Sequence, residues 1–223
     1  MANYPVEQDT LLPFLPPRTE LDTWGGDPYV SLVGFQFREV RVKGRRIPFH
    51  THFPEVNLRF YVRYKDGSSW KRGVVFVREI VPLPAVAWVA NILFRERYIS
   101  LPMRYVEASD ETVLRTAYHW YHKNHWNSIS LKAASQPQHL REGSQEEFIT
   151  EHFWGYAKAG ADNTNEYQVA HPRWEVYPVT ECLVECDFGR LYGPAFAGLG
   201  GRKPQSAFLA EGSAISVYSK SSV

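Results

Sequence analysis

The sequence predicts an α+β fold in which a mostly antiparallel β-sheet curls into a barrel or half-barrel with two or so short helices. Three observations support this. Many short segments alternate apolar and polar residues with a period of two, which is typical of strands. Turn signals such as Asp66-Gly67 separate these segments. Only two segments, 82–98 and 143–154, carry helix signals, so strands dominate the predicted domain.

The first 28 residues contain five prolines and are expected to form an irregular arm over a single domain that spans 1–223. Residues 29–44 alternate apolar and polar side chains and end in a glycine turn, so they predict a strand. The segment 49–64 predicts a second strand. The Asp-Gly turn after it predicts an antiparallel hairpin with the β-branched run at 74–81.

In the first predicted helix, 82–98, apolar residues fall at helical spacing: Ala85, Trp88, Val89, Ile92 and Leu93. A meander of three strands is expected next, at 103–108, 112–123 and 125–134.

The second helix begins at a capping box, in which Glu147 follows Ser144 by three residues. Two strands broken at 171–174, an irregular glycine-rich stretch at 191–204 and a final strand pair within 206–219 complete the predicted order.

The strand 49–64 carries the best candidate site. Glu55, Asn57, Arg59 and Tyr61 occupy alternate positions, and apolar residues lie between them. Side chains two positions apart stand about 7 Å apart on one strand face, so these groups can converge on one small polar ligand. Arginine binds a carboxylate or phosphate, glutamate can move a proton and asparagine can orient either. The alternative is an exposed face whose glutamate and arginine pair in water.

Histidines offer weaker candidates. His50 and His52 share a strand face, and His119, His122 and His125 cluster around a turn, but no carboxylate or cysteine accompanies them at a recognised ligand spacing. No metal site is therefore predicted. His171, which precedes a proline, has either a structural role in an extended turn or a place in the ligand site.

Composition narrows the function classes. The 25 lysines and arginines nearly balance the 24 aspartates and glutamates, which argues against a nucleic-acid partner. No stretch approaches the length of a membrane span, and no phosphate-binding loop is found, so neither a membrane nor a cofactor is expected. Cys182 and Cys186 lie too far apart in a strand for an unstrained disulfide, which favours free thiols and a cytoplasmic location.

Four segments in order resemble the YqjF-like family of bacterial proteins, domain of unknown function 2071: "GFQFREVRVKGRRIP-HTHFPEVNLRFYV", "RGVVFVREIVPLPAVAWVANILF", "FITEHFWGY" and "HPRWEVYPV". The likeness covers residues 29–180. That family is grouped with the acetoacetate decarboxylase-like fold, a β-rich barrel with an internal cavity. The resemblance implies that the polar face of the 49–64 strand lines this cavity.

The resemblance also implies a difference in chemistry. Acetoacetate decarboxylases carry a lysine pair just after the equivalent helix, and one lysine forms a Schiff base. Here that region reads "NILFRERYISLPMRY", with arginines and no lysine. Arginine stays protonated and is a poor nucleophile, so imine-forming decarboxylation is not expected. Of the residues in the decarboxylase pattern, the resemblance places only the glutamate in this sequence, as Glu55.

The leading interpretation is a protein that binds a small anionic or carbonyl-bearing organic molecule in a polar-lined barrel cavity. Arg59 would hold the ligand's charge, Asn57 would orient it, and Glu55 would act as a general acid or base. Tyr61 and His171 complete the predicted ligand site. The alternatives are a non-imine lyase or hydrolase that uses the same cavity, and an interaction scaffold with a filled barrel. Whether the chain is an enzyme and how many copies assemble stay open at this point.

Overall fold

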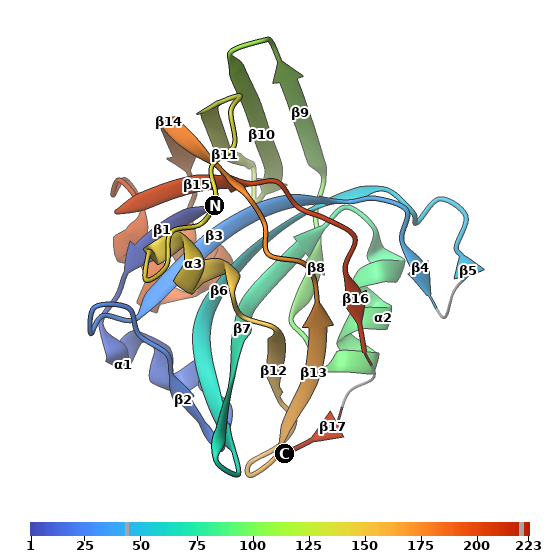
Figure 1. Ribbon diagram of the computed structural model, residues 1–223. Helices are drawn as coiled ribbons and strands as arrows, with labels where there is room; N and C mark the ends of the chain where they lie inside the picture. Colours follow the sequence, from blue (N-terminus) through green and yellow to red (C-terminus); the bar gives the residue numbers. More distant parts are fainter. Residues whose placement is uncertain (43–44, 219–220) are drawn as a thin grey trace.

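The computed structural model describes residues 1–42, 45–218 and 221–223, and most of them belong to one large curled sheet (Figure 1). Its strands follow one another in the order β16 (Ser216–Val217), β13 (Thr164–Ala170), β12 (Trp154–Lys158), β7 (Ser69–Val81), β6 (Phe53–Asp66), β3 (Tyr29–Phe37), β1 (Ala2–Pro5), β15 (Ser206–Ala210), β14 (Val176–Glu185), β11 (His125–Ala134), β10 (Val113–His122) and β9 (Met103–Ser109). The order has two ends, so the sheet is open, and the predicted α+β half-barrel is confirmed.

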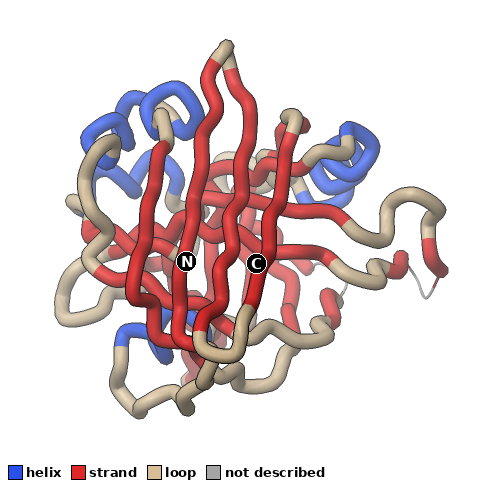
Figure 2. Tube along the Cα trace, turned by 90° about the horizontal axis from the view of Figure 1, so that it is seen from above, coloured by secondary structure: helices blue, strands red, loops and turns tan. Residues whose placement is uncertain are grey.

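Five short strands lie outside this order. β2 (Thr19–Leu21) pairs with β6, β8 (Tyr98–Ser100) with β7, and β17 (Ser221–Ser222) with β13, while β4 (Arg41–Val42) and β5 (Arg45–Arg46) pair with each other. The helical segments are α1 (Gln8–Leu11), η1 (Leu12–Phe14), α2 (Pro84–Phe94), α3 (Gln145–Thr150), α4 (Phe188–Tyr192) and η2 (Pro194–Leu199). Seen from above, the long strands lie side by side and the helices stand around their margins (Figure 2).

Both predicted helices and the predicted hairpin are present. α2 and α3 fall inside the predicted segments, and β6 and β7 pair as antiparallel neighbours around a turn at Asp66 to Ser69. The meander of β9, β10 and β11 is antiparallel as expected. α2 has 11 residues, and none of the described helices reaches the length and apolar character that crossing a bilayer requires.

Three expectations differ from the structure. The first 28 residues are not an irregular arm, because β1 pairs with both β3 and β15 and β2 pairs with β6. Proline has no N–H for a central ladder position, and Pro5 accordingly lies at the end of β1. The glycine-rich stretch 191–204 contains the end of α4 and all of η2, because its Gly193 and Pro194 separate two helical turns.

The last two strands also do not pair with each other. β15 lies between β1 and β14, whereas β16 pairs with β13 at the far end of the sheet.

Strand β6 separates two regions of the interior. Its residues Val56, Leu58 and Phe60 point into the largest hydrophobic cluster, together with residues of β3, β7, β10, β11, α4 and η2. On the other face of the strand, Tyr61 packs in a second cluster with Phe148 of α3. Because successive side chains of a strand alternate between its faces, the polar residues of β6 share the side of Tyr61. Both faces of β6 are therefore covered by protein.

Candidate functional site

The polar face of β6 lies in the protein interior. Glu55 and Asn57 are each 1% exposed, and Arg59 is half-buried. The sequence pattern was compatible with a solvent-exposed face or with an inward one. The structure buries this face, so its charged groups need partners within the protein or on a bound molecule.

The carboxylate of Glu55 is held at both oxygens. Asn57 Nδ2 donates to Glu55 Oε1 and Tyr98 Oη donates to Glu55 Oε2, each at 3.0 Å. Burial raises the pKa of Glu55 to about 7, although these two hydrogen bonds and the positive charge of Arg59 act in the opposite direction. Glu55 can therefore gain or lose a proton near neutral pH.

Two further carboxyl groups lie close to Glu55. Glu79 on β7 is 2% exposed, and Glu96, which is half-buried, lies in the turn between α2 and β8. Burial, followed by the negative charges of neighbouring glutamates, raises the pKa of Glu79 well above its usual value and that of Glu96 to about 8. Tyr167 Oη donates to Glu96 Oε1 at 2.8 Å. Because like charges in one buried site oppose ionisation, this glutamate cluster (Glu55, Glu79 and Glu96) retains protons at neutral pH.

A β-bulge brings Glu79 to this face. From Asp66 to Arg59 the hairpin keeps one register, but Leu58 pairs with Arg78 while Arg59 pairs with Phe76, so Val77 is an extra residue. Asn57 consequently lies opposite Glu79. In the register set by the turn, Arg78 would lie opposite Asn57 and share its face. The bulge thus places a carboxyl group, and not a guanidinium, beside Asn57.

The C-terminal end of α2 positions the other two members. Arg95 ends the helix in the left-handed conformation, with φ of 60°, and the chain turns back at Glu96. Asn91 in the last turns of α2 then clamps the returning chain, because its Nδ2 donates to the Tyr98 carbonyl at 3.0 Å and its Oδ1 accepts from the Tyr98 N–H at 2.7 Å. This clamp fixes where the Tyr98 hydroxyl meets Glu55.

Tyr167 reaches Glu96 because its neighbour across the ladder is a glycine. Gly155 of β12 pairs with Tyr167 of β13, and a Cβ at Gly155 would lie 2.2 Å from the tyrosine ring. The ring therefore lies over the backbone of β12, which only glycine permits.

Several polar atoms around this face lack a hydrogen-bond partner among the described residues. Arg59 donates from its Nη2 to the Ile149 carbonyl at 3.3 Å, but its Nε is unpaired. Asn57 Oδ1 and Glu79 Oε2 are also buried and unpaired. Buried polar groups in folded proteins almost always have a partner, so these atoms mark a place where a polar molecule would be bound.

Tyr61 continues the face toward α3. Its hydroxyl lies 2.5 Å from Ser31 Oγ, and its ring contacts the rings of Phe148 and His152. Burial lowers the pKa of His152 to about 4, so its imidazole is neutral at pH 7 and its Nε2 lies 3.1 Å from Asp22 Oδ2.

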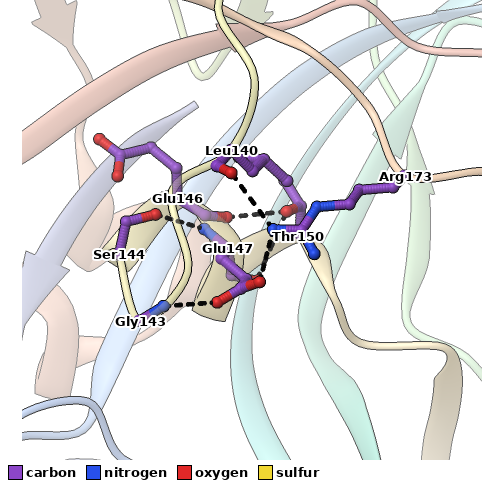
Figure 3. A network of polar contacts seen from close by, with 7 residues as sticks. All are labelled: Leu140, Gly143, Ser144, Glu146, Glu147, Thr150 and Arg173. Carbon is purple, nitrogen blue, oxygen red and sulfur yellow. Dashed lines mark hydrogen bonds and ion pairs between the residues drawn. The ribbon is translucent and has the colours of Figure 1, made fainter.

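Helix α3 covers this end of the site and is fixed by the network in Figure 3. Ser144 Oγ accepts from the Glu147 N–H at 3.2 Å, as the capping box predicted. The Glu147 carboxylate accepts from the Gly143 N–H at 2.7 Å and from Arg173 at 2.5 Å. A surface cleft of about 350 Å³ lies beside α3, and Phe148 both lines this cleft and contacts Tyr61.

The remaining predicted residues lie elsewhere. His171 stacks on Trp174, with ring centroids 4.1 Å apart, and its Nδ1 lies 2.8 Å from the Pro172 carbonyl. The structure thus gives it contacts with its own turn and with Phe153, and none of these belongs to the glutamate cluster. His52 pairs with Glu39 on the surface. Within the described part of the chain, no group of three or more His, Cys, Asp or Glu side chains has an arrangement that could hold a metal ion.

Sequence reasoning missed Glu79, Glu96, Tyr98 and Tyr167. Glu79 had a usable signal, because a carboxylate inside the β-branched run "VVFVREIV" requires an explanation. Glu96 and Tyr98 had none, since their position depends on how the chain turns after α2. Tyr167 would have required the pairing with Gly155.

Comparison with known proteins gave the following similarities. Residues 1–214 match the model of the DUF2071 family, described as an uncharacterized conserved protein. A 76-residue stretch, 34% of this chain, is 37% identical to the uncharacterized protein YqjF of Bacillus subtilis and covers only 30% of its length.

Solved structures show the same fold at low identity. Acetoacetate decarboxylase from Legionella pneumophila has a TM-score of 0.54 and 12% identity over 82% of this chain and 69% of the enzyme. The enduracididine biosynthesis enzyme MppR has a TM-score of 0.57 and 10% identity over 99% of this chain and 80% of its own, and it has also been solved with pyruvate.

Proposed function

Because the chain belongs to the DUF2071 family of YqjF-like proteins and shares the acetoacetate decarboxylase-like fold, we propose that it binds a small carboxylate- or carbonyl-bearing organic molecule at the buried polar face of β6. The observation that carries this proposal is the set of unpaired buried polar atoms on and beside that face, namely Asn57 Oδ1, Arg59 Nε and Glu79 Oε2. An anionic oxygen of the ligand would accept from Arg59 Nε, a carbonyl oxygen would accept from protonated Glu79, and a hydroxyl or N–H of the ligand would donate to Asn57 Oδ1.

Each residue has a role that follows from its contacts. Arg59 binds the anionic end of the ligand, since its Nε is unpaired and, among the described residues, its Nη2 donates to the Ile149 carbonyl and to Met1 Sδ rather than to a carboxylate. Asn57 orients the ligand, because its amide nitrogen is already used by Glu55 and its oxygen remains available to a donor. Tyr61 forms the wall beside Arg59, whose guanidinium lies 5.7 Å from the ring centroid.

Glu55 would exchange a proton with the ligand. Its pKa of about 7 lets it act as acid or base near neutral pH, and Glu96, with a pKa of about 8, can relay a second proton through the same buried cluster. This observation favours a lyase or another proton-transfer enzyme as the second candidate function on the same site. Phe148 separates the site from the surface cleft, so its movement would give the ligand a route inward.

Imine formation on a lysine is not part of this proposal. The turn after α2 presents Glu96 and Tyr98 to the site, and the lysine Lys71 is engaged elsewhere by Asp66 and Glu166 at 2.8 and 3.0 Å. Borohydride reduction in the presence of a β-keto acid should therefore leave every lysine unmodified in a peptide mass map. A stable reduced adduct on one lysine would contradict this.

Binding can be tested with pyruvate and acetoacetate as probes, by ligand-observed NMR and calorimetry. Arg59→Ala should weaken binding by at least about tenfold, because it removes the charged hydrogen bond to the carboxylate. Arg63→Ala is the control, since Arg63 lies four residues along the same strand but its side chain, 41% exposed, already pairs with the Glu20 carboxylate at 3.2 Å. Equal losses in both variants, or no binding of either probe to the parent at millimolar concentration, would refute the proposal.

A further inference from the structure

The outer face of α2 is apolar and exposed. The side chains at helical spacing point away from the sheet: Trp88 is 66% exposed, Val89 40%, Ile92 56% and Leu93 49%. The helix contacts the body through Ala87, which is 6% exposed. A helix that is apolar nearly all round is normally buried. Here its stripe faces outward, and an exposed apolar patch of this kind marks an interaction surface.

From these data we infer that this stripe is a self-association surface, on which α2 of a second copy of the chain packs. The four side chains expose roughly 400 Å² of apolar surface, about half of the ~800 Å² that each partner buries in a standard interface. The inference is independent of the proposed ligand.

Neighbouring segments supply the remaining area. Val40 and Phe53, at the base of the arm that carries β4 and β5, pack in the same hydrophobic cluster as Ala87, and Figure 1 shows this arm beside α2. Two exposed apolar residues, Ile47 at 43% and Phe49 at 94%, lie on the arm. The interface would thus combine an apolar helix with an aromatic residue at its edge.

The chemistry of α2 favours a second copy over a lipid surface. The segment Pro84–Phe94 has no charged residue, and Asn91 is its one polar side chain. Helices that lie on membranes carry a strongly charged face rich in lysine and arginine, whereas self-association interfaces are apolar, depleted of charge and enriched in aromatic residues. A two-fold axis places the same helix on both partners, and because α2 carries no charge it can meet its own copy without repulsion.

Self-association would also affect the residues of the candidate site that α2 holds in place. Asn91 holds Tyr98 through two hydrogen bonds, and the ring of Phe94 lies 5.3 Å from that of Tyr167. A partner packed on α2 would therefore restrain the helix that positions Tyr98 and Glu96.

Sedimentation velocity of the full chain, from micromolar to submillimolar concentration, tests the inference. The parent should sediment at twice the 25.7 kDa chain mass. Trp88→Glu and Ile92→Glu should each raise the dimer dissociation constant by about 100-fold or more, because each would bury an unpaired carboxylate. Both positions are exposed in the single chain, so circular dichroism and thermal melts should keep the folded signal. Trp88→Ala, a milder change, should weaken the dimer in the same direction.

The control is Leu183→Glu on β14, at a residue that is 57% exposed and outside α2, and it should leave the dimer intact. A parent that stays monomeric throughout, or a dimer unaffected by both glutamate substitutions, would overturn the inference. Flotation of a monomeric parent with vesicles of anionic phospholipid would also overturn it and would assign the surface to lipid.

Discussion

Residues of the same charge differ in burial and in hydrogen-bond partners around β6, and these differences change their chemistry. Arg59 and Arg63 lie on one strand face, yet Arg59 is half-buried and bonded to a backbone carbonyl, whereas Arg63 pairs with Glu20 near solvent. Glu55, buried beside two hydrogen-bond donors, has a pKa near 7, whereas Asp22, bonded to Arg72 and His152, has its pKa lowered. Burial with or without a cationic partner decides which of these carboxyl groups can hold a proton.

Replacement of Arg59 should reveal this electrostatic link. Arg59 lowers the pKa of Glu55, so Arg59→Ala should raise it and cost more stability where Glu55 must ionise. We expect a loss of about 1 kcal/mol at pH 6 and about 3 kcal/mol at pH 8.5 in urea unfolding. In a Glu55→Gln background the pH dependence of this loss should disappear. A loss of the same size at both pH values would show that the two groups do not interact.

The two cysteines give a simpler expectation. Cys182 and Cys186 are both free thiols in the structure. Thiol titration of the unfolded, unreduced protein should therefore find two reactive groups, whereas a count of zero would require a disulfide between them.

At the scale of elements, short irregularities place the site. The bulge at Val77 changes which residue of β7 faces Asn57, and the left-handed Arg95 ends α2 so that Tyr98 returns toward Glu55. Helix α3 has only six residues, too few to be stable by propensity alone, so its capping box and Arg173 determine whether it covers the site.

Loss of the α3 cap should be measurable. Ser144→Ala removes the acceptor for the Glu147 N–H and should lower the free energy of unfolding by about 1 kcal/mol. Ser144→Asp, which keeps a capping oxygen, should retain most of the stability. Hydrogen exchange should be faster in residues 145–150 of the alanine variant than of the parent, and unchanged exchange there would mean that Arg173 and Glu147 suffice to hold the helix.

At the scale of the whole molecule, the glutamate cluster sets how stability depends on pH. Glu55 and Glu96 have pKa values of about 7 and 8 in the folded chain and near 4.5 when unfolded, so the folded state binds more protons between these values. Stability from these groups is present at low pH and is lost as pH rises through 7 and 8. Neutral His152, with its pKa of about 4, acts in the opposite direction between pH 4 and 6.5.

Above pH 6.5 the glutamates and the Met1 amino group still change their protonation. Burial lowers the pKa of that amino group from 8.0 to about 5, so it adds stability as pH rises and opposes the glutamates. The contribution of Glu96 is therefore measured as the difference between the parent and Glu96→Gln: between pH 6.5 and 8.5 the free energy of unfolding of the parent should fall relative to that of the variant by at least about 1 kcal/mol in urea titrations. A difference that stays constant over this interval would contradict the raised pKa of Glu96.

Local patterns by themselves determined much of this protein. The two-residue period of β6, the Asp-Gly turn before β7, the helical spacing of α2 and the Ser144–Glu147 cap each depend on residues close in sequence, and the structure has all four elements. The inward face with Glu55, Asn57 and Arg59 was also one of the two options that the pattern of β6 allowed.

Long-range packing decided the rest. The cover over β6 comes from α3 and the turn after α2, so the burial that raises the pKa of Glu55 could not be inferred from the strand alone. The positions of Glu79 and Glu96 beside Glu55 depend on the bulge in β7 and on the end of α2. His171 packs within its own turn, where it stacks on Trp174. The spacing of α2 predicted its apolar stripe but not its direction, because which side of a helix meets a sheet depends on the other residues that the sheet presents.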